Sequence, residues 1–342
     1  MAVMSLAPAE RAGLPERVEL AALPTPLTTA PRLAADLGIG RLLVKRDDLT
    51  GFALGGNKAR SLEFLIAEAL REGADTLVTG GSPESNFVVC AAAAARTAGL
   101  SCRLVIAGEP AAHAPGLGLA RSWGASVTWT GAADRASVDD TLPREAENLA
   151  ARGRRPYVMP RGGATALGAV GYALAAAELH DQLAEAGLRH ARVVVAVGSG
   201  CTLAGLVAGN ALLGWPWRLL GASVSRPPEE THRRVLELAT DCLTLLADVG
   251  WADRAAARRA ASGIRGSRVE LVDARGPGHG LASADGRQAA DAALRTEGLV
   301  VDPVYTAKAL ATRREVTDEP TVVFWHTGGL LATIAAAAGQ PL

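Results

Sequence analysis

Lys58 is the residue in this sequence that is best suited to covalent chemistry. It follows Gly55, Gly56 and Asn57, and it is one of only three lysines in a chain that has thirty-two arginines. Because arginine fills nearly every other cationic position, a lysine beside two glycines indicates a function that needs a neutral amine, which arginine cannot supply. The alternative interpretation is a solvated lysine at the start of a helix.

The segment after Lys58 predicts the element that positions it. Apolar residues recur with helical period over residues 60–72, so Lys58 should lie in the first turn of a helix. The positive end of the helix dipole disfavours an ammonium there and lowers the pKa of a lysine. The reactive amine form of Lys58 should therefore be easier to reach.

A second candidate site follows the most apolar strand of the chain, residues 192–197. The sequence continues Gly198-Ser199-Gly200-Cys201-Thr202 and then enters a helix, so backbone N–H groups and the helix dipole could bind one phosphate group. Two other interpretations remain open. The turn could bind no ligand, or it could bind a dinucleotide, although Leu203 replaces the third glycine of that motif and only Arg226 favours NADP.

Lys58 and the turn at residues 198–202 together predict pyridoxal 5′-phosphate. The aldehyde of this cofactor bonds to a lysine amine, while its phosphate is held by a separate anion site. Either feature alone is modest evidence. Because both occur in one chain and supply the two ends of a single cofactor, we expect a pyridoxal-phosphate enzyme.

The composition argues against several other classes of function. The chain has 35 basic and 35 acidic residues, so no charge excess favours nucleic acid or an anionic membrane. No apolar run reaches the roughly 20 residues that span a bilayer, and we expect no secretory signal. The four cysteines and six histidines show no metal-binding spacing. We expect a cytoplasmic protein without a metal, whose partner is a small molecule.

Apolar strands alternate with helix-length segments along the chain. This alternation is typical of an α/β fold in which helices cover both faces of a parallel sheet. Gly162 and Gly163 interrupt the pattern, and there we expect the chain to pass between domains. The expected strands are residues 41–46, 76–79, 103–107, 126–129, 157–159, 192–197, 219–225, 269–272 and 321–325.

Five motifs follow one another along the chain: Gly55-Gly56-Asn57-Lys58, Ser85-Asn86, residues 198–202, residues 296–308 and His326-Thr327-Gly328-Gly329. In type and order they resemble the motifs of the D-cysteine desulfhydrase and 1-aminocyclopropane-1-carboxylate (ACC) deaminase family. The resemblance covers residues 20–335.

This resemblance implies a two-domain, tryptophan-synthase-β-like α/β fold (pyridoxal-phosphate fold type II) with twisted, mainly parallel sheets. A large cofactor-binding domain would comprise residues 1–57 and 165–342, and a smaller α/β domain, residues 58–164, would be inserted in it. The cofactor would lie in the cleft between the domains. The resemblance also implies a homodimer.

The resemblance assigns roles to individual residues as well. Lys58 would hold the cofactor and move the Cα proton of a small amino-acid substrate. Ser85 would face the substrate, Tyr305 would stack beside substrate and cofactor, and Asn86 would contact the ring hydroxyl and the substrate. The residues expected to bind the cofactor together with Lys58 are Asn57, Asn86, Gly198, Ser199, Gly200, Cys201, Thr202 and Thr306.

Thr306 indicates which reaction to expect. The resemblance places this residue opposite the pyridine nitrogen, at the exit of a strand, where deaminases of the family carry a carboxylate and desulfhydrases carry threonine. A neutral hydroxyl stabilises a protonated ring less, so the cofactor is a weaker electron sink. We therefore favour β-elimination, or β-replacement, and place an ACC-deaminase-like ring opening second.

Two residues depart from the family pattern where the substrate should bind. Glu84 replaces a glutamine, which removes two amide donors near the expected substrate carboxylate. His279 replaces a tyrosine and could act as an acid, a base or an anion-binding group. A specialised substrate and a binding protein that has lost the reaction therefore stay open as alternatives. An NADP-dependent oxidoreductase that uses the turn after residue 197 is a further alternative.

Overall fold

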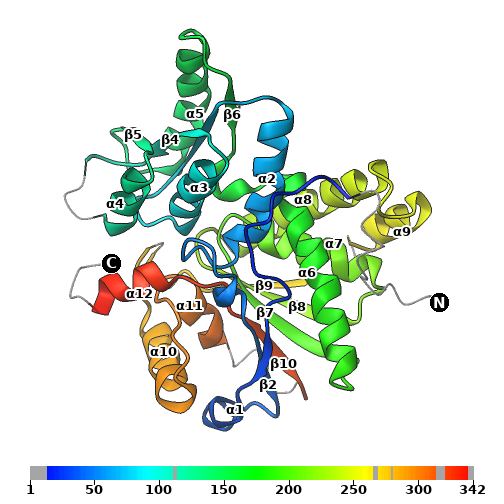
Figure 1. The fold of residues 1–342 in the computed structure, drawn as a ribbon. Helices are drawn as coiled ribbons and strands as arrows, with labels where there is room; N and C mark the ends of the chain where they lie inside the picture. The colour runs from blue at the N-terminus through cyan, green and yellow to red at the C-terminus, as the bar shows by residue number, and fades with distance from the viewer. Residues whose placement is uncertain (1–13, 111–113, 265–268, 279, 313–319, 338–342) are drawn as a thin grey trace.

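The chain folds around two separate β-sheets, each covered by helices on both faces (Figure 1). The computed structural model describes residues 14–110, 114–264, 269–278, 280–312 and 320–337. The six-stranded sheet has the order β1-β2-β10-β7-β8-β9, and the four-stranded sheet has the order β5-β4-β3-β6. Every neighbouring pair is parallel except β1 and β2. The predicted α/β class with mainly parallel sheets is confirmed.

The strands of the six-stranded sheet come from both ends of the chain. They are β1 (Leu27–Thr29), β2 (Leu42–Lys45), β7 (Ala191–Val197), β8 (Trp217–Ser223), β9 (Val269–Asp273) and β10 (Val322–Trp325). The four-stranded sheet lies between them in sequence. Its strands are β3 (Thr76–Gly81), β4 (Ser101–Ile106), β5 (Ser126–Trp129) and β6 (Pro156–Val158).

The six-stranded sheet is buried between two layers of helices. One layer consists of α6 (Ala166–Glu185), α7 (Cys201–Leu212), α8 (Pro228–Asp248) and α9 (Arg254–Ile264), and the other of α1 (Pro31–Leu37), α10 (Ala284–Glu297) and α11 (Thr306–Leu310). Along β7, Val193 and Val195 pack into the first layer, whereas Val194 packs into the second. Burial on both faces explains why this strand is apolar at nearly every position.

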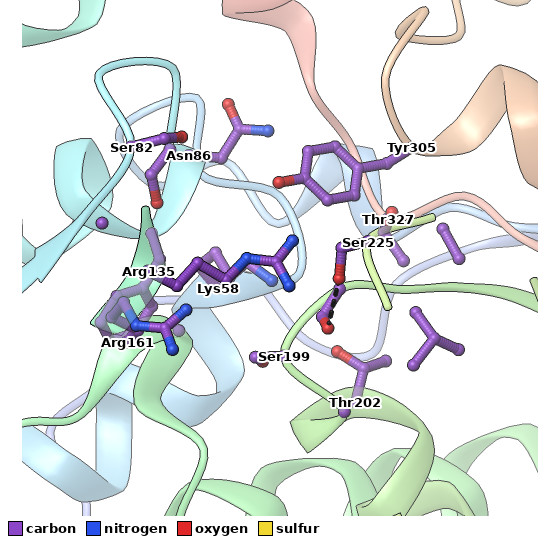
Figure 2. Close-up of a pocket in the computed structure, with 18 of the residues that line it drawn as sticks. Lys58, Ser82, Asn86, Arg135, Arg161, Ser199, Thr202, Ser225, Tyr305 and Thr327 are labelled. Carbon is purple, nitrogen blue, oxygen red and sulfur yellow. Dashed lines mark hydrogen bonds between the residues drawn. The ribbon is translucent and has the colours of Figure 1, made fainter. Parts of the chain in front are cut away.

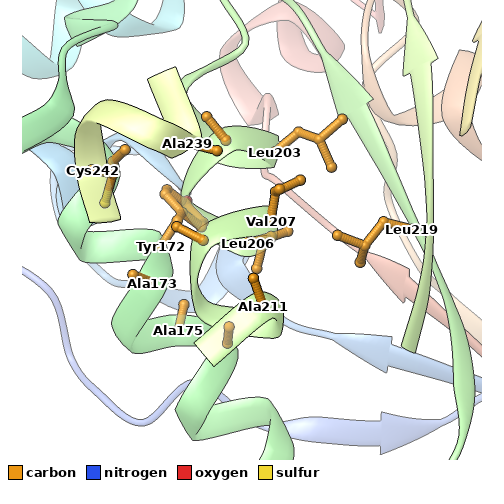
Figure 3. Packing of buried hydrophobic residues seen from close by; sticks show 14 of the residues in the cluster. Tyr172, Ala173, Ala175, Leu203, Leu206, Val207, Ala211, Leu219, Ala239 and Cys242 are labelled. Carbon is orange, nitrogen blue, oxygen red and sulfur yellow. The ribbon is translucent and has the colours of Figure 1, made fainter. Parts of the chain in front are cut away.

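Helix α7 lies at the centre of the first layer, as Figure 3 shows. Its residues Leu203, Leu206 and Val207 are fully buried between α6 and the sheet, where Leu219 of β8 contributes to the same cluster. Because α7 is apolar around its circumference, it is stable only in this covered position. The packing fixes the N-terminus of α7, and with it the turn at residues 198–202.

The four-stranded sheet has its own two hydrophobic clusters. Helices α2 (Lys58–Arg71), α3 (Asn86–Thr97) and α4 (Pro115–Ser122) cover one face, and α5 (Arg135–Ala150) covers the other. Helix α2 also packs against α6 of the large sheet's layer. All four strands lie within the predicted inserted domain, residues 58–164, but the two boundaries themselves stay a prediction because α2 contacts both parts.

One expectation about the elements was wrong, and two helices were not predicted. Tyr305 and Thr306 do not lie at the exit of a strand, because Tyr305 caps the short helix α11 and Thr306 begins it. The sequence patterns also did not predict α9 or α12 (Leu330–Ala337). Helix α12 is apolar with little periodicity, so packing rather than local pattern decides it, whereas α9 is amphipathic and its pattern was missed. Among the described residues, no helix is long and apolar enough to cross a membrane.

Candidate active site

A cavity of about 350 Å³ lies where the carboxyl ends of strands from both sheets face each other. Parallel α/β sheets bind ligands at this edge because the loops after the strands converge there. The wall includes the strand ends Gly81 and Val197. The predicted site residues that line the cavity are Asn57, Lys58, Ser85, Asn86, Gly198, Ser199, Gly200, Thr202 and Tyr305 (Figure 2).

The loop before Lys58 is held by close backbone contact. Gly56 has φ of +52°, and a Cβ atom there would lie 2.4 Å from the carbonyl oxygen of Thr327. The N–H of Asn57 donates to that same carbonyl over 3.0 Å. Only glycine permits both the backbone conformation and this approach. As predicted, helix α2 then begins at Lys58, whose side chain lines the cavity.

A buried ionic network lies beneath this loop. Asp47 is fully buried and accepts hydrogen bonds from Arg60 (2.8 Å to Oδ1) and from the indole of Trp325 (2.8 Å to Oδ2). Arg60 also donates to Glu178, which pairs in turn with Lys45. Two cations therefore face two carboxylates, so the network as a whole is neutral. Lys45 is close to Asp47 and Asp48 in sequence but binds Glu178.

Tyr172 connects this network to the cofactor loop. Its hydroxyl lies 2.7 Å from the carbonyl oxygen of Asn57 and 3.2 Å from Oδ2 of Asp47. The side-chain amide of Asn57 donates to Thr202 over 2.9 Å, although the two residues are 145 positions apart. The lysine loop and the turn before α7 are thus joined directly, which fixes the distance between the two proposed cofactor-binding features.

Burial lowers the pKa of Lys58, and the opposing electrostatic effects of Cys201, Cys90 and Asp302 do not restore it. The sequence predicted this direction from the helix dipole. The structure shows that the main cause is the loss of solvent around the ammonium, which penalises the charged form. Lys58 is therefore poised to react as an amine.

The turn at residues 198–202 has the conformation expected of an anion site. Gly200 has φ of +98°, which favours glycine, and α7 begins immediately after it at Cys201. The first N–H groups of a helix have no partner within it and point toward the turn. Cys201 contributes only through its backbone, because its thiol is directed away from the cavity and donates to the carbonyl of Gly163 over 3.3 Å.

Asp302 is a cavity residue that the sequence did not single out. Its carboxylate accepts N–H bonds from Val304 (3.0 Å), Tyr305 (2.7 Å) and Thr306 (2.8 Å). Burial raises the pKa of Asp302, and these hydrogen bonds oppose the rise. The hydroxyl of Thr306 is fully buried against Asp302 and does not line the cavity. A role for Thr306 at the pyridine nitrogen stays a prediction.

The residues predicted to face the substrate are only partly brought together. Ser85 caps α3 by accepting from the N–H of Val88 over 3.4 Å, and Asn86 begins that helix. Glu84 is exposed and does not line the cavity, although it adds to the effect of burial that raises the pKa of Tyr305 to about 12. His279 lies outside the described residues. The expectation that Glu84 and His279 contact substrate stays a prediction.

Comparison with known proteins identifies the family. The family model described as "Pyridoxal-phosphate dependent enzyme" matches residues 18–328. The chain belongs to this family. It is 39% identical over 331 residues to the D-cysteine desulfhydrase of Salmonella choleraesuis strain SC-B67, a match that covers 93% of this chain and 95% of the relative.

Two further relatives agree. A Pyrococcus abyssi protein, provisionally named a 1-aminocyclopropane-1-carboxylate deaminase, is 35% identical over 326 residues and matches 92% of each chain. The crystal structure of an ACC deaminase homologue superposes with a TM-score of 0.84 at 32% identity and covers 97% of this chain and 98% of its own. The predicted family, the pyridoxal-phosphate fold type II and the cofactor are confirmed.

The described residues fit this cofactor. A lysine with a lowered pKa and a glycine turn at a helix N-terminus face the same cavity, and the Asn57–Thr202 hydrogen bond holds them together. The cavity volume of about 350 Å³ lies in the range of small-molecule sites. Between the two cofactors that the sequence left open, the family match favours pyridoxal phosphate over NADP.

Proposed function

We propose that this enzyme removes the Cα proton of a small amino acid and eliminates its β substituent, and the similarity to a protein named D-cysteine desulfhydrase supports this proposal. The observation that carries this proposal is the amine of Lys58, with its lowered pKa, in one cavity with the anion-binding turn. When bound, pyridoxal phosphate would draw electrons away from Cα. With cysteine, the net reaction consumes water and yields pyruvate, ammonia and hydrogen sulfide.

In the proposed mechanism different side chains accept the proton, bind the substrate carboxylate and orient the substrate. The amine of Lys58 accepts the proton from Cα, because a lysine must be uncharged to act as a base. The N-terminus of α3, with Ser85 and Asn86, offers N–H donors and a positive dipole end to the substrate carboxylate. Tyr305 forms the opposite wall, where a Cβ at Gly198 would be 3.1 Å from its ring. These contacts orient the Cα–H bond toward Lys58.

The alternatives receive less support. The binding protein without activity was suggested by Glu84 and His279; Glu84 is exposed and does not line the cavity, and His279 lies outside the described residues. Ring opening of ACC remains the second choice because one relative bears that name, but no described carboxylate other than Asp302 and Asp134 lines the cavity. β-Replacement would use the same residues as elimination and differ only in the final nucleophile.

We further propose that the enzyme is a cytoplasmic homodimer. Apolar side chains are exposed on two adjoining segments, which the N–H of Asp48 joins to the carbonyl of His326 over 3.0 Å. These side chains are Leu49, Leu54, Leu330 and Ile334, each exposed by 41–53%. Such clusters mark contact surfaces. Light scattering should show a dimer for the wild type. Leu54→Asp should dissociate this dimer, whereas Leu294→Asp, on an exposed face of α10, should leave it intact. A monomeric wild type contradicts this proposal.

An absorbance spectrum and product assays test the main proposal. The purified protein with added pyridoxal phosphate should show a yellow band that Lys58→Ala abolishes. Lys308→Gln is the control, because Lys308 donates to backbone carbonyls of Arg275 and Gly278 and should leave the band in place. A band that persists in Lys58→Ala excludes Lys58 as the cofactor lysine.

Product formation then distinguishes the reactions. Pyruvate should form from D- or L-cysteine and from β-chloroalanine, and 2-oxobutyrate should form slowly or not at all from ACC. Faster release of 2-oxobutyrate from ACC than of pyruvate from any β-substituted amino acid would refute elimination as the main activity. A yellow protein that releases no product from any of them would be a binding protein.

A further inference from the structure

Three arginines line the cavity from three different elements. Arg135 begins α5, Arg161 lies in the short 3-10 helix Arg161–Gly163, and Arg226 follows β8. They are close enough to affect one another. Burial and then Arg161 lower the pKa of Arg135, and burial followed by Arg135, Arg234 and Arg161 lowers the pKa of Arg226 to about 10. An α-amino acid has one carboxylate, which gives no reason for three guanidinium groups.

Carboxylates pair with two of these arginines, Arg161 and Arg226. Arg161 forms a two-pronged pair with Asp139 (2.7 and 2.6 Å), and Arg226 pairs with Glu230 over 3.0 Å. Asp134 also lines the cavity, but its carboxylate caps α5 by accepting the N–H of Ser137. Arg135 makes no hydrogen bond or ion pair with any residue that the structure describes. Its charge is therefore available to a ligand.

Unlike Arg226, Arg135 does not bind the turn at residues 198–202. Arg226 and Arg234 donate to the carbonyl oxygens of Gly198 and Ser199 and so hold the turn in place. In Figure 2, Arg135 extends into the cavity. Its guanidinium is near enough to Tyr305 to oppose the rise in the pKa of that residue. Arg135 thus reaches the space where the amino acid would bind.

We propose that Arg135, supported by Arg161 and Arg226, binds an anionic group on the β substituent of the substrate. The preferred substrate class is then a β-substituted alanine that carries a phosphate or sulfate group, and this inference rests on the proposed function. With O-phosphoserine, Lys58 takes the Cα proton, the C–H electron pair forms the Cα–Cβ double bond, and the Cβ–O bond breaks with its electrons on phosphate. Uptake of one water then gives pyruvate, ammonia and inorganic phosphate.

Binding to a ligand that cannot react tests this proposal without turnover. 2-Amino-3-phosphonopropionate carries the anion on a stable C–P bond, and 2-aminobutyrate is its neutral counterpart. Calorimetric titration of the yellow holoenzyme should show at least tenfold tighter binding of the phosphonate, in the D or the L form. Arg135→Gln should weaken phosphonate binding roughly 10- to 100-fold, as the loss of hydrogen bonds between charged groups does. The ratio of the two affinities should then fall below about threefold.

Arg144 provides a matched control because it lies on the exposed side of the same helix. Arg144→Gln should preserve the affinity ratio of the wild type. Kinetics give a second measurement, since O-phosphoserine should exceed β-chloroalanine in kcat/KM by at least tenfold in the wild type and lose that advantage in Arg135→Gln.

Two results overturn the proposal. One is equal affinity of the wild type for the phosphonate and for 2-aminobutyrate. The other is a loss of pyridoxal-phosphate affinity in Arg135→Gln as large as the loss of phosphonate affinity, because Arg135 would then belong to the cofactor phosphate. A yellow enzyme that eliminates chloride from β-chloroalanine but shows no preference for anions refutes only this inference. A protein that never turns yellow refutes the proposed function itself.

Discussion

Asp47→Asn should strongly destabilise the protein without touching the cavity. Asp47 is one of two carboxylates that balance Lys45 and Arg60 in the buried network, and its side chain is 0% exposed. The amide has nearly the same shape but no charge, and its NH₂ group must face Arg60 or Trp325, which are both donors. The substitution leaves a net positive charge buried beneath the loop that holds Lys58.

The expected cost follows from this burial. Removing one partner of a buried ion pair typically costs about 3–5 kcal/mol. With a urea dependence of about 3 kcal/mol per molar for a large chain, the unfolding midpoint should fall by about 1 M or more. Asp48→Asn is the matched control, because Asp48 pairs with Arg46 where both side chains are partly exposed. Its cost should be below about 1 kcal/mol.

A double substitution tests whether charge balance is the cause. Lys45→Met alone leaves the network negative, and Asp47→Asn alone leaves it positive, whereas the two together restore neutrality. The double variant should therefore be more stable than the sum of the single costs predicts, by at least about 1 kcal/mol. Additive costs, or an Asp48→Asn variant as unstable as Asp47→Asn, would falsify this account.

The same network predicts how stability depends on pH. Burial would raise the pKa values of Asp47 and Glu178, but Arg60 and Lys45 outweigh it and hold both values below the ordinary ones. A lowered native pKa means that the stabilisation is complete above the unfolded-state pKa, about 4, and is lost as the pH falls through the native value. The stability difference between the wild type and Asp47→Asn should therefore narrow below about pH 4.

Three further predictions concern the cofactor loop. Gly56→Ala should abolish cofactor binding, because the new Cβ would be 2.4 Å from a carbonyl oxygen. The Gly38→Ala variant, also at positive φ but with nothing within 4 Å, should bind the cofactor normally. Equal cofactor affinity of the two variants in a spectral titration would contradict this prediction. The rate of cofactor uptake should rise with pH and level off below pH 10.5, since the pKa of Lys58 is lowered. A rate that continues to rise beyond pH 10.5 would contradict the lowered pKa. Asn57→Ala removes the hydrogen bond to Thr202 and should weaken pyridoxal-phosphate affinity roughly tenfold, as measured by equilibrium dialysis. An unchanged affinity would show that this hydrogen bond does not contribute to cofactor binding.

Local patterns in the sequence were enough to predict the elements that carry the site. The helix that begins at Lys58, the apolar strand β7 and the glycine turn after it are all encoded by neighbouring residues. Periodicity and turn chemistry act over a few positions, so they can be read from the chain itself. Combined with the order of five motifs, these elements were sufficient to predict the fold class and the cofactor, which the family match confirms.

Contacts between distant residues could not be predicted in this way. Lys45 is close to two aspartates in sequence, yet it binds Glu178, 133 residues away. Asp302 lies within the motif at residues 296–308, but only the folded chain brings its carboxylate to three N–H groups at the cavity wall. Nothing in the local pattern around Arg135, Arg161 and Arg226 relates one to another, because they belong to three separate elements.

The sequence by itself therefore determined which chemistry is available to this protein, because the reactive amine and the phosphate turn are each built from consecutive residues. Only the tertiary structure decided what surrounds that chemistry. The lowered pKa of Lys58 comes mainly from burial, and the arginines of the cavity meet only because the two sheets face each other. Burial and charge proximity depend on how separate elements pack, and no single stretch of sequence contains that information.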